Sequence, residues 1–245
     1  MKIFALSIVI LVFTISTSYA DTLGEKMQSL GFIENAPPAK DTPEWKILSG
    51  QRAFIVSTKN GISIRLAERS DLSRPETKFN TGKIEYIGTD HGEFGGQLFT
   101  KDWISTEPLL SGNVKSMIPV GHDLYVFTGM THMIFDRGSV HVVRNYHKPS
   151  TPGRITLLPS APAAVMLDED QYKPVFVIVG QNSFMILEPD DGLQVIAHNT
   201  FWMLRFPSSL IRFEDYYVFG IRGGVVAVSA TLFGKTDIRY FEPEQ

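Results

Sequence analysis

The sequence predicts an all-β protein, a β-propeller-like fold of about five four-stranded antiparallel blades with a short N-terminal helix. A repeat of ~40–50 residues filled by short strands and turns is typical of a propeller blade. The phenylalanines of three Val-Phe pairs are spaced by 49 and 43 residues. A β-sandwich or barrel is the alternative, because consecutive antiparallel strands also fit two packed sheets. The three pairs are Val126-Phe127, Val175-Phe176 and Val218-Phe219.

Each repeat unit is expected to hold four strands joined by short polar turns. In the first unit, Asp136-Arg137-Gly138 is expected to join the third and fourth strands. Glycine suits such turns because it adopts positive φ without steric cost. Two less regular units before residue 114 bring the expected number of blades to about five. The three regular units are expected at residues 114–146, 154–198 and 201–241. The four strands of the first unit are expected at residues 117–120, 124–128, 130–135 and 140–143.

Residues 1–20 have the three-part pattern of a secretory signal peptide. Lys2 is basic, residues 3–15 are almost entirely apolar, and Ser18 and Ala20 are the small residues of a cleavage site. The apolar run is shorter than the ~20 residues that span a bilayer, and no later segment approaches that length. We therefore expect an exported protein, periplasmic or extracellular, that begins at Asp21 after cleavage and has no membrane span.

Residues 21–43 are expected to form a short helix and a linker, followed by the β-propeller-like domain over residues 44–245. Leu23, Met27 and Leu30 recur at helical spacing, whereas residues 34–43 are rich in Pro and Ala. The domain is expected to start with a hairpin, because apolar runs at 51–57 and 62–66 flank Asn60-Gly61. A long polar loop is expected at residues 70–81, which contain Pro75.

Composition limits the classes of partner. The chain of 245 residues has no cysteine, so its stability must come from burial of apolar surface rather than from disulfides. Its formal net charge is −3, and no block of basic residues is present. Nucleic acid is therefore not an expected partner.

The segment from Asp90 to Gln97 is the most suggestive local cluster. It places Asp90, His91 and Glu93 beside three glycines, which allow a ligand or backbone to approach closely. One interpretation is an acid–base or metal-binding loop, with these three residues as catalytic candidates. The other is a polar turn in which Asp90 caps the backbone. The second is favoured because no other cluster completes a set of ligands.

Histidines and acidic runs provide no complete metal site. If Arg137-Gly138 is a two-residue loop, His132 and His141 share a face and lie diagonally across a hairpin. Two histidines are too few ligands for a structural zinc, so we expect exposed strand histidines and no metal. The Asp168-Glu169-Asp170 run lacks the order of an EF-hand loop and is expected to be a solvated loop. No cofactor motif is present, and none is expected.

Aromatic side chains provide the remaining candidates for binding. Most aromatic residues should belong to the core between sheets. Trp103, Tyr146 and His147 instead lie in expected connections, where they are candidates for contact with a partner or for local loop packing. The serines lack the Gly-x-Ser-x-Gly pattern of a nucleophile elbow.

The expected function is recognition rather than catalysis. An exported repeat scaffold with loop-rich faces and no complete catalytic set predicts a protein that binds another protein, as an inhibitor or immunity factor in the cell envelope. The alternative is an envelope hydrolase or carbohydrate-binding domain that uses the Asp90–Gln97 loop, with a glycan as its partner. A structural assembly scaffold is a third class.

Overall fold

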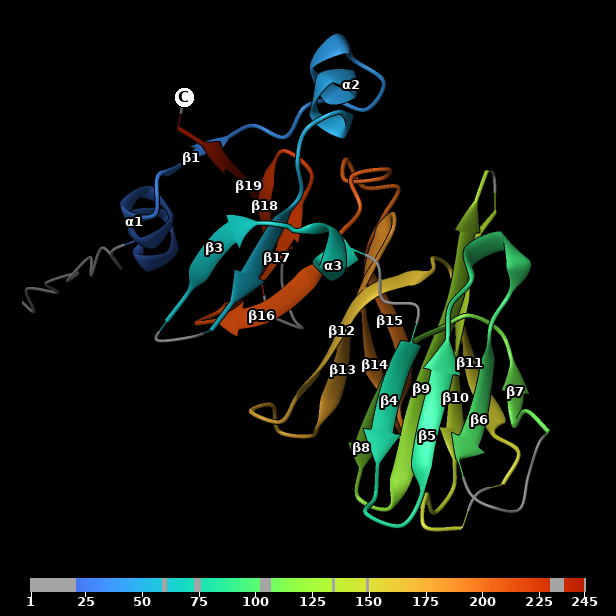
Figure 1. Cartoon of the computed structure of the whole chain (residues 1–245). Coiled ribbons are helices and arrows are strands. Elements are labelled where there is room, and N and C mark those ends of the chain that lie inside the picture. Colours follow the sequence, from blue (N-terminus) through green and yellow to red (C-terminus); the bar gives the residue numbers. More distant parts are fainter. Residues whose placement is uncertain are drawn as a thin grey trace, which may run out of the picture.

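The computed structural model describes residues 21–244 apart from 59–60, 73–75, 102–106, 134, 149 and 230–235. The expected signal peptide and Trp103 therefore lie outside the described residues. The described chain is mostly β and forms five separate antiparallel sheets, with a short helix near its N-terminus (Figure 1). The all-β class and the N-terminal helix are thus confirmed. None of the described helices is long and apolar enough to cross a bilayer.

The sheets follow one another along the chain, and each is built from consecutive strands. The first is a two-stranded hairpin, as expected for the Asn60-Gly61 segment. Three sheets have four strands, and β1 (Phe32–Asn35) extends the last sheet to five. The first sheet contains β2 (Phe54–Ser57) and β3 (Ser63–Leu66). The second contains β4 (Glu76–Asn80), β5 (Glu85–Thr89), β6 (Gln97–Lys101) and β7 (Leu110–Ser111).

The other three sheets contain the repeat units. The third has β8 (Val114–Val120), β9 (Asp123–His132), β10 (Phe135–Val143) and β11 (Gly153–Leu158). The fourth has β12 (Pro162–Asp168), β13 (Val175–Gly180), β14 (Ser183–Glu188) and β15 (Gly192–His198). The fifth has β16 (Ser209–Phe213), β17 (Tyr216–Ile221), β18 (Gly224–Ser229) and β19 (Ile238–Pro243).

The strand prediction was wrong in part of the third sheet. Asp136-Arg137-Gly138 was expected to be a turn but lies inside β10, and Asp136 pairs with Thr131. The turn lies between His132 and Phe135, where Met133 has a φ of 52°. The fourth strand is therefore β11, which was assigned to the next unit. In the fourth and fifth sheets, every strand overlaps its expected position.

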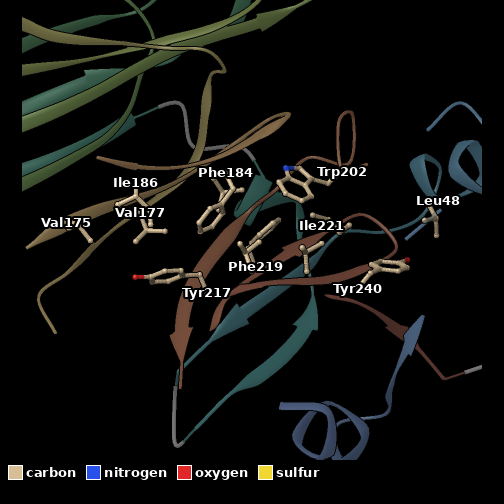
Figure 2. Close-up of a cluster of buried hydrophobic side chains, with 13 residues drawn as sticks. Leu48, Val175, Val177, Phe184, Ile186, Trp202, Tyr217, Phe219, Ile221 and Tyr240 are labelled. Atoms are coloured by element: carbon tan, nitrogen blue, oxygen red, sulfur yellow. The ribbon is translucent and has the colours of Figure 1, made fainter. Parts of the chain in front are cut away.

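Four apolar clusters hold the sheets together, and each joins two neighbouring sheets. They link the second sheet to the third, the third to the fourth, the fourth to the fifth, and the fifth to β2–β3 and the N-terminal helix. Figure 2 shows the third of these, in which Phe184 of β14 lies beside Tyr217 and Phe219 of β17. No cluster of described residues joins β2–β3 to the second sheet, so the stack is not closed into a ring.

The Val-Phe pairs are equally buried but do not all face the same way. All six side chains are at most 2% exposed, as the repeat predicts. Phe176 and Phe219 pack toward the preceding sheet, whereas Phe127 packs toward the following one. The first pair is therefore not structurally equivalent to the other two, although its burial matches theirs. A shift of one residue along a strand moves each side chain to the opposite face.

The N-terminal segment is part of the last sheet rather than a linker to it. Helix α1 (Thr22–Ser29) buries Leu23 and Met27, as its spacing predicts. Strand β1 (Phe32–Asn35), expected to begin a linker, instead pairs with β19. The Arg239 side chain of β19 forms ion pairs with both Asp21 and Glu34. These contacts fix the start of the described chain to its C-terminal strand.

Two further helices correct the sequence prediction. Helix α2 (Pro43–Ser49) was expected to be the end of a linker and the start of a strand. The Thr42 side chain caps the N-terminus of this helix by accepting a hydrogen bond from the Trp45 backbone N–H, and Pro43 occupies the first turn of the helix. Helix α3 (Arg69–Leu72) and β4 occupy most of the expected loop at 70–81.

Candidate functional site

Two pockets are prominent among the described residues, and the Asp90–Gln97 loop lies between them. The inner pocket has a volume of about 390 Å³, and it is lined by Asp71 of α3 and by residues from the four larger sheets and their loops. The outer pocket has a volume of about 420 Å³ and lies over one face of the third sheet. Asp90 lines the inner pocket and Gly95 the outer one. The segment singled out from the sequence therefore contributes to both.

The carboxylates of the inner pocket each face a cation. Asp90 is 2.5 Å from the Lys115 ammonium group, and Asp71 is 2.6 Å from the Arg65 guanidinium group. Arg222 donates a hydrogen bond to the Ser49 carbonyl and stacks at 4.2 Å over the Phe206 ring. Two carboxylates with separate cationic partners do not form the facing pair that glycoside hydrolysis requires. This pocket therefore supports binding better than acid–base catalysis.

The outer pocket is built on a face of the third sheet where the strand register aligns polar side chains. Thr128 pairs with Ser139, Met130 with Arg137, and paired residues project to the same face. Strand β11 adds Leu157 opposite Ser139 and Arg154 opposite His141. The opposite wall is formed by the loops that carry Gly95, Ser111 and Asn113.

A hydrogen-bonded row of hydroxyl and imidazole groups forms the floor of the outer pocket. The Ser139 hydroxyl lies 2.9 Å from both the Thr128 hydroxyl and His141 Nε2. Burial lowers the pKa of His141 below its ordinary value, and the charge of Arg154 lowers this pKa further. The imidazole is therefore mainly neutral at pH 7. The row presents hydrogen-bonding groups without a negative charge.

The Asp90–Gln97 loop is held by its own backbone and by Asn113. Asp90 accepts a hydrogen bond from the Gly92 backbone N–H, the capping role considered from the sequence. The Asn113 amide accepts from the His91 backbone N–H and donates to the Gly92 carbonyl. A Cβ atom on Gly96 would lie 2.1 Å from the Thr89 carbonyl oxygen, so only glycine fits there. The two candidate acids of this loop have different partners. Asp90 pairs with Lys115, whereas Glu93 pairs with His132 at 3.1 Å.

The histidine geometry expected from the sequence was wrong. His132 and His141 do lie on the same face of the third sheet, but His132 pairs with Phe135 and His141 with Val126. Six residues of β9 therefore separate their positions, which is roughly 20 Å along a strand. Within the described chain, no group of three or more His, Asp or Glu side chains is arranged to hold a metal ion.

Four apolar side chains are exposed around the outer pocket. Phe94 precedes Gly95 of the pocket wall, and Met133 lies at the tip of the β9–β10 hairpin. Phe135 lies at 5.8 Å from the Arg137 guanidinium, and Leu157 lines the pocket. We call these four side chains the apolar rim. Their exposed fractions are 87% for Phe94, 86% for Met133, 49% for Phe135 and 62% for Leu157.

The aromatic candidates from the sequence lie at the opposite end of the β9 strand. The Tyr146 hydroxyl donates a hydrogen bond to the Gly121 carbonyl, and its ring contacts Phe79 at 5.2 Å. His147 is exposed and lies 4.5 Å from the Tyr146 ring. Tyr146 is thus packed locally, as one of its two interpretations predicted. These residues do not approach either pocket.

The residues of the outer pocket were missed because their strand was assigned as a turn. Arg137, Ser139 and His141 alternate along β10, so an extended strand places all three on one face. That alternation is visible in the sequence once the turn is placed between His132 and Phe135. Arg154 and Leu157 join them only through the pairing of β11, which sequence spacing does not indicate.

A scan against models of protein families found no match to this chain, and a search of curated proteins found none either. The function is therefore argued from the geometry of the site alone.

Arg205 is an additional charged group with unusual surroundings. Its side chain is fully buried, and none of its three guanidinium nitrogens has a hydrogen-bond partner among the described residues. The guanidinium lies 4.5 Å from the centre of the Trp45 ring of α2. Burial lowers its pKa. The cation–π contact offsets only part of the cost of burying these donors.

We expect Arg205→Met to stabilise the fold. Methionine has similar length and no polar atom to desolvate, so the free energy of unfolding should rise by about 1–3 kcal/mol, the cost of an unsatisfied buried group. Thermal and urea denaturation of the purified protein measure the change. A decrease would show that the guanidinium makes stabilising bonds that outweigh its burial.

Proposed function

We propose that this protein is an exported, non-enzymatic recognition protein that binds another protein through the apolar rim and the outer pocket. The observation that carries the proposal is the cluster of four exposed apolar side chains at one pocket. Single exposed apolar residues are ordinary, but several of them near one polar cavity are typical of an interaction site. Phe94 and Phe135 are aromatic, the class of side chain enriched in protein interfaces.

We propose that the five sheets are the blades of an open propeller-like scaffold. Support comes from the apolar clusters, each of which joins two neighbouring sheets, and from the inner pocket, to which α3 and the four larger sheets contribute. Such a scaffold presents loops at the ends of its blades, where binding residues are commonly found. The apolar rim lies on one of these loop-rich ends.

The cellular setting of the proposal comes from the N-terminal sequence. A signal peptide over residues 1–20 would export the chain, and its partner would then be periplasmic or extracellular. Inhibition of an envelope-acting enzyme, or immunity against one, is the role we propose within that class. A hydrolase or glycan-binding role for the Asp90–Gln97 loop has less support, because Asp90 is engaged with Lys115 and Glu93 with His132.

The proposal predicts that charge on the apolar rim will prevent capture of the partner. Immobilised protein is incubated with an envelope extract, and retained proteins are quantified by mass spectrometry. We expect one stoichiometric partner for the unmodified chain and a loss of at least about tenfold for Phe94→Asp combined with Met133→Asp. Both side chains are exposed, so the melting temperature should be almost unchanged.

Tyr172→Asp is the matched control, because Tyr172 is fully exposed on a loop of the fourth sheet. It should retain the partner at the level of the unmodified chain. Equal capture by the rim variant would disprove binding through this surface. Retention of glycan with no stoichiometric protein would instead favour the carbohydrate-binding alternative.

A further inference from the structure

We infer that the outer pocket receives an acidic side chain, Asp or Glu, from an apolar segment of the partner protein. This inference rests on the proposed function, since the same surface carries both. It names the chemistry of the partner segment, which the apolar rim alone does not specify. A protein segment fits better than a free anion because the exposed Leu157 lines the pocket and the half-exposed Phe135 lies against Arg137, so apolar surface adjoins the cationic groups.

The first observation is the charge of the pocket lining. Arg137 and Arg154 line the pocket together with His141, and none of the lining residues is acidic. No described carboxylate forms an ion pair with either arginine, whereas the exposed Arg65 and Arg144 each have one. Two guanidinium groups at one cavity, neither paired with a carboxylate of the described residues, favour an anionic occupant.

The second observation is the composition of the floor. Thr128 and Ser139 bring hydroxyl groups to the pocket, and Asn113 brings a side-chain amide. Gly129 of β9 pairs with Gly138 of β10 beneath these groups. A Cβ atom on either glycine would lie within 3.0 Å of the Ala161 or Pro162 side chain, so a larger residue would clash at these two positions. Hydroxyl and amide donors complement a carboxylate, which only accepts hydrogen bonds when ionised.

The third observation is how polar and apolar groups are arranged. Leu157 and Met130 line the pocket beside the arginines, and Phe135 lies against Arg137. An occupant that fills this site must present a carboxylate to the pocket and apolar side chains to the rim. An acidic residue flanked by leucine or phenylalanine has this arrangement. The cavity of about 420 Å³ is large enough for one such side chain.

The test uses two short peptides as probes, acetyl-Leu-Glu-Phe-amide and its counterpart acetyl-Leu-Gln-Phe-amide. Binding to the ¹⁵N-labelled protein is followed through the amide resonances of Gly112, Gly129 and Gly138. We expect the Glu peptide to bind at least about tenfold more tightly than the Gln peptide, because only the former offers a charged acceptor. The difference should shrink as salt is raised from 50 to 500 mM.

Arg137→Gln and Arg154→Gln test whether the pocket carries the preference. Both side chains are exposed, so the substitutions should not affect folding. Each should reduce the preference for the Glu peptide by about fivefold or more. Arg52→Gln, which changes an exposed arginine away from the pocket, should leave it unchanged. Equal binding of the two peptides, or sodium acetate binding as tightly as the Glu peptide, would overturn the inference.

Capture from the envelope extract separates failure of this inference from failure of the proposed function. If the rim variant loses the partner while the two arginine variants retain it fully, the recognition function stands and the acidic-segment inference is wrong. If the arginine variants lose the Glu preference but the unmodified chain captures no partner, the pocket chemistry stands and the proposed function is wrong.

Discussion

Phe176→Ala should lower the free energy of unfolding by about 3–5 kcal/mol, the loss typical of a fully buried phenylalanine. The Phe176 ring is fully buried and lies 4.7 Å from the Tyr125 ring and 5.1 Å from the Phe127 ring. It belongs to the fourth sheet and these partners to the third, so its removal leaves a cavity between two sheets. Urea denaturation followed by tryptophan fluorescence measures the effect.

Phe135→Ala is the matched control for that prediction. The Phe135 ring is half-exposed at the apolar rim, and its truncation should cost less than about 1 kcal/mol. A loss of less than about 1 kcal/mol for Phe176→Ala as well would contradict the packing of the third sheet against the fourth.

Asp168→Ala should cause a loss of similar size, for an electrostatic reason. The Asp168 carboxylate is almost completely buried and accepts hydrogen bonds from Arg212 and from the Tyr217 hydroxyl. These donors belong to the fifth sheet, so the carboxylate joins it to the fourth. Its removal leaves the buried Tyr217 hydroxyl without this acceptor and Arg212 with only the more distant Asp170, and we expect a cost of about 3–5 kcal/mol, as when one partner of a buried ion pair is lost. The expectation of a solvated loop was wrong for this residue.

The same carboxylate predicts how stability depends on pH. Burial raises the pKa of Asp168, but the hydrogen bonds from Tyr217, Gln171 and the Asp170 backbone, with the charge of Arg212, outweigh it and lower the pKa overall. Its contribution is therefore present above the unfolded pKa of about 3.9 and is lost as pH falls through the lower folded value. When the pH is lowered from 7 to 3, the free energy of unfolding should fall less for Asp168→Ala than for the unmodified chain.

Asp170→Ala provides the control for both measurements. Asp170 is largely exposed, 3.7 Å from Arg212, and its substitution should change the free energy of unfolding by less than about 1 kcal/mol. A similar, small effect for Asp168→Ala would show that the contact between the fourth and fifth sheets does not depend on this carboxylate.

The candidate site could be predicted only in part, and the reason lies in the register of one hairpin. The sequence indicated the Asp90–Gln97 loop, and the structure places this loop beside both pockets. Its acidic residues proved to be engaged with Lys115 and His132. Of the arginines that line the outer pocket, Arg137 was assigned to a turn and Arg154 to the start of the next unit. A hairpin turn displaced by a few residues changes every cross-strand pair, so local turn propensity could not identify them.

The sequence by itself determined where apolar strands alternate with polar turns, because burial and turn formation depend on residue types within a few positions. It therefore predicted the strands of the fourth and fifth sheets, the hairpin at Gly61 and the helix that buries Leu23. Tertiary structure alone decided that β1 pairs with β19, that the stack remains open, and that Arg137 and Arg154 reach one pocket. These features depend on segments far apart in the chain, whose contacts are selected by the packing of the whole fold rather than by local preference.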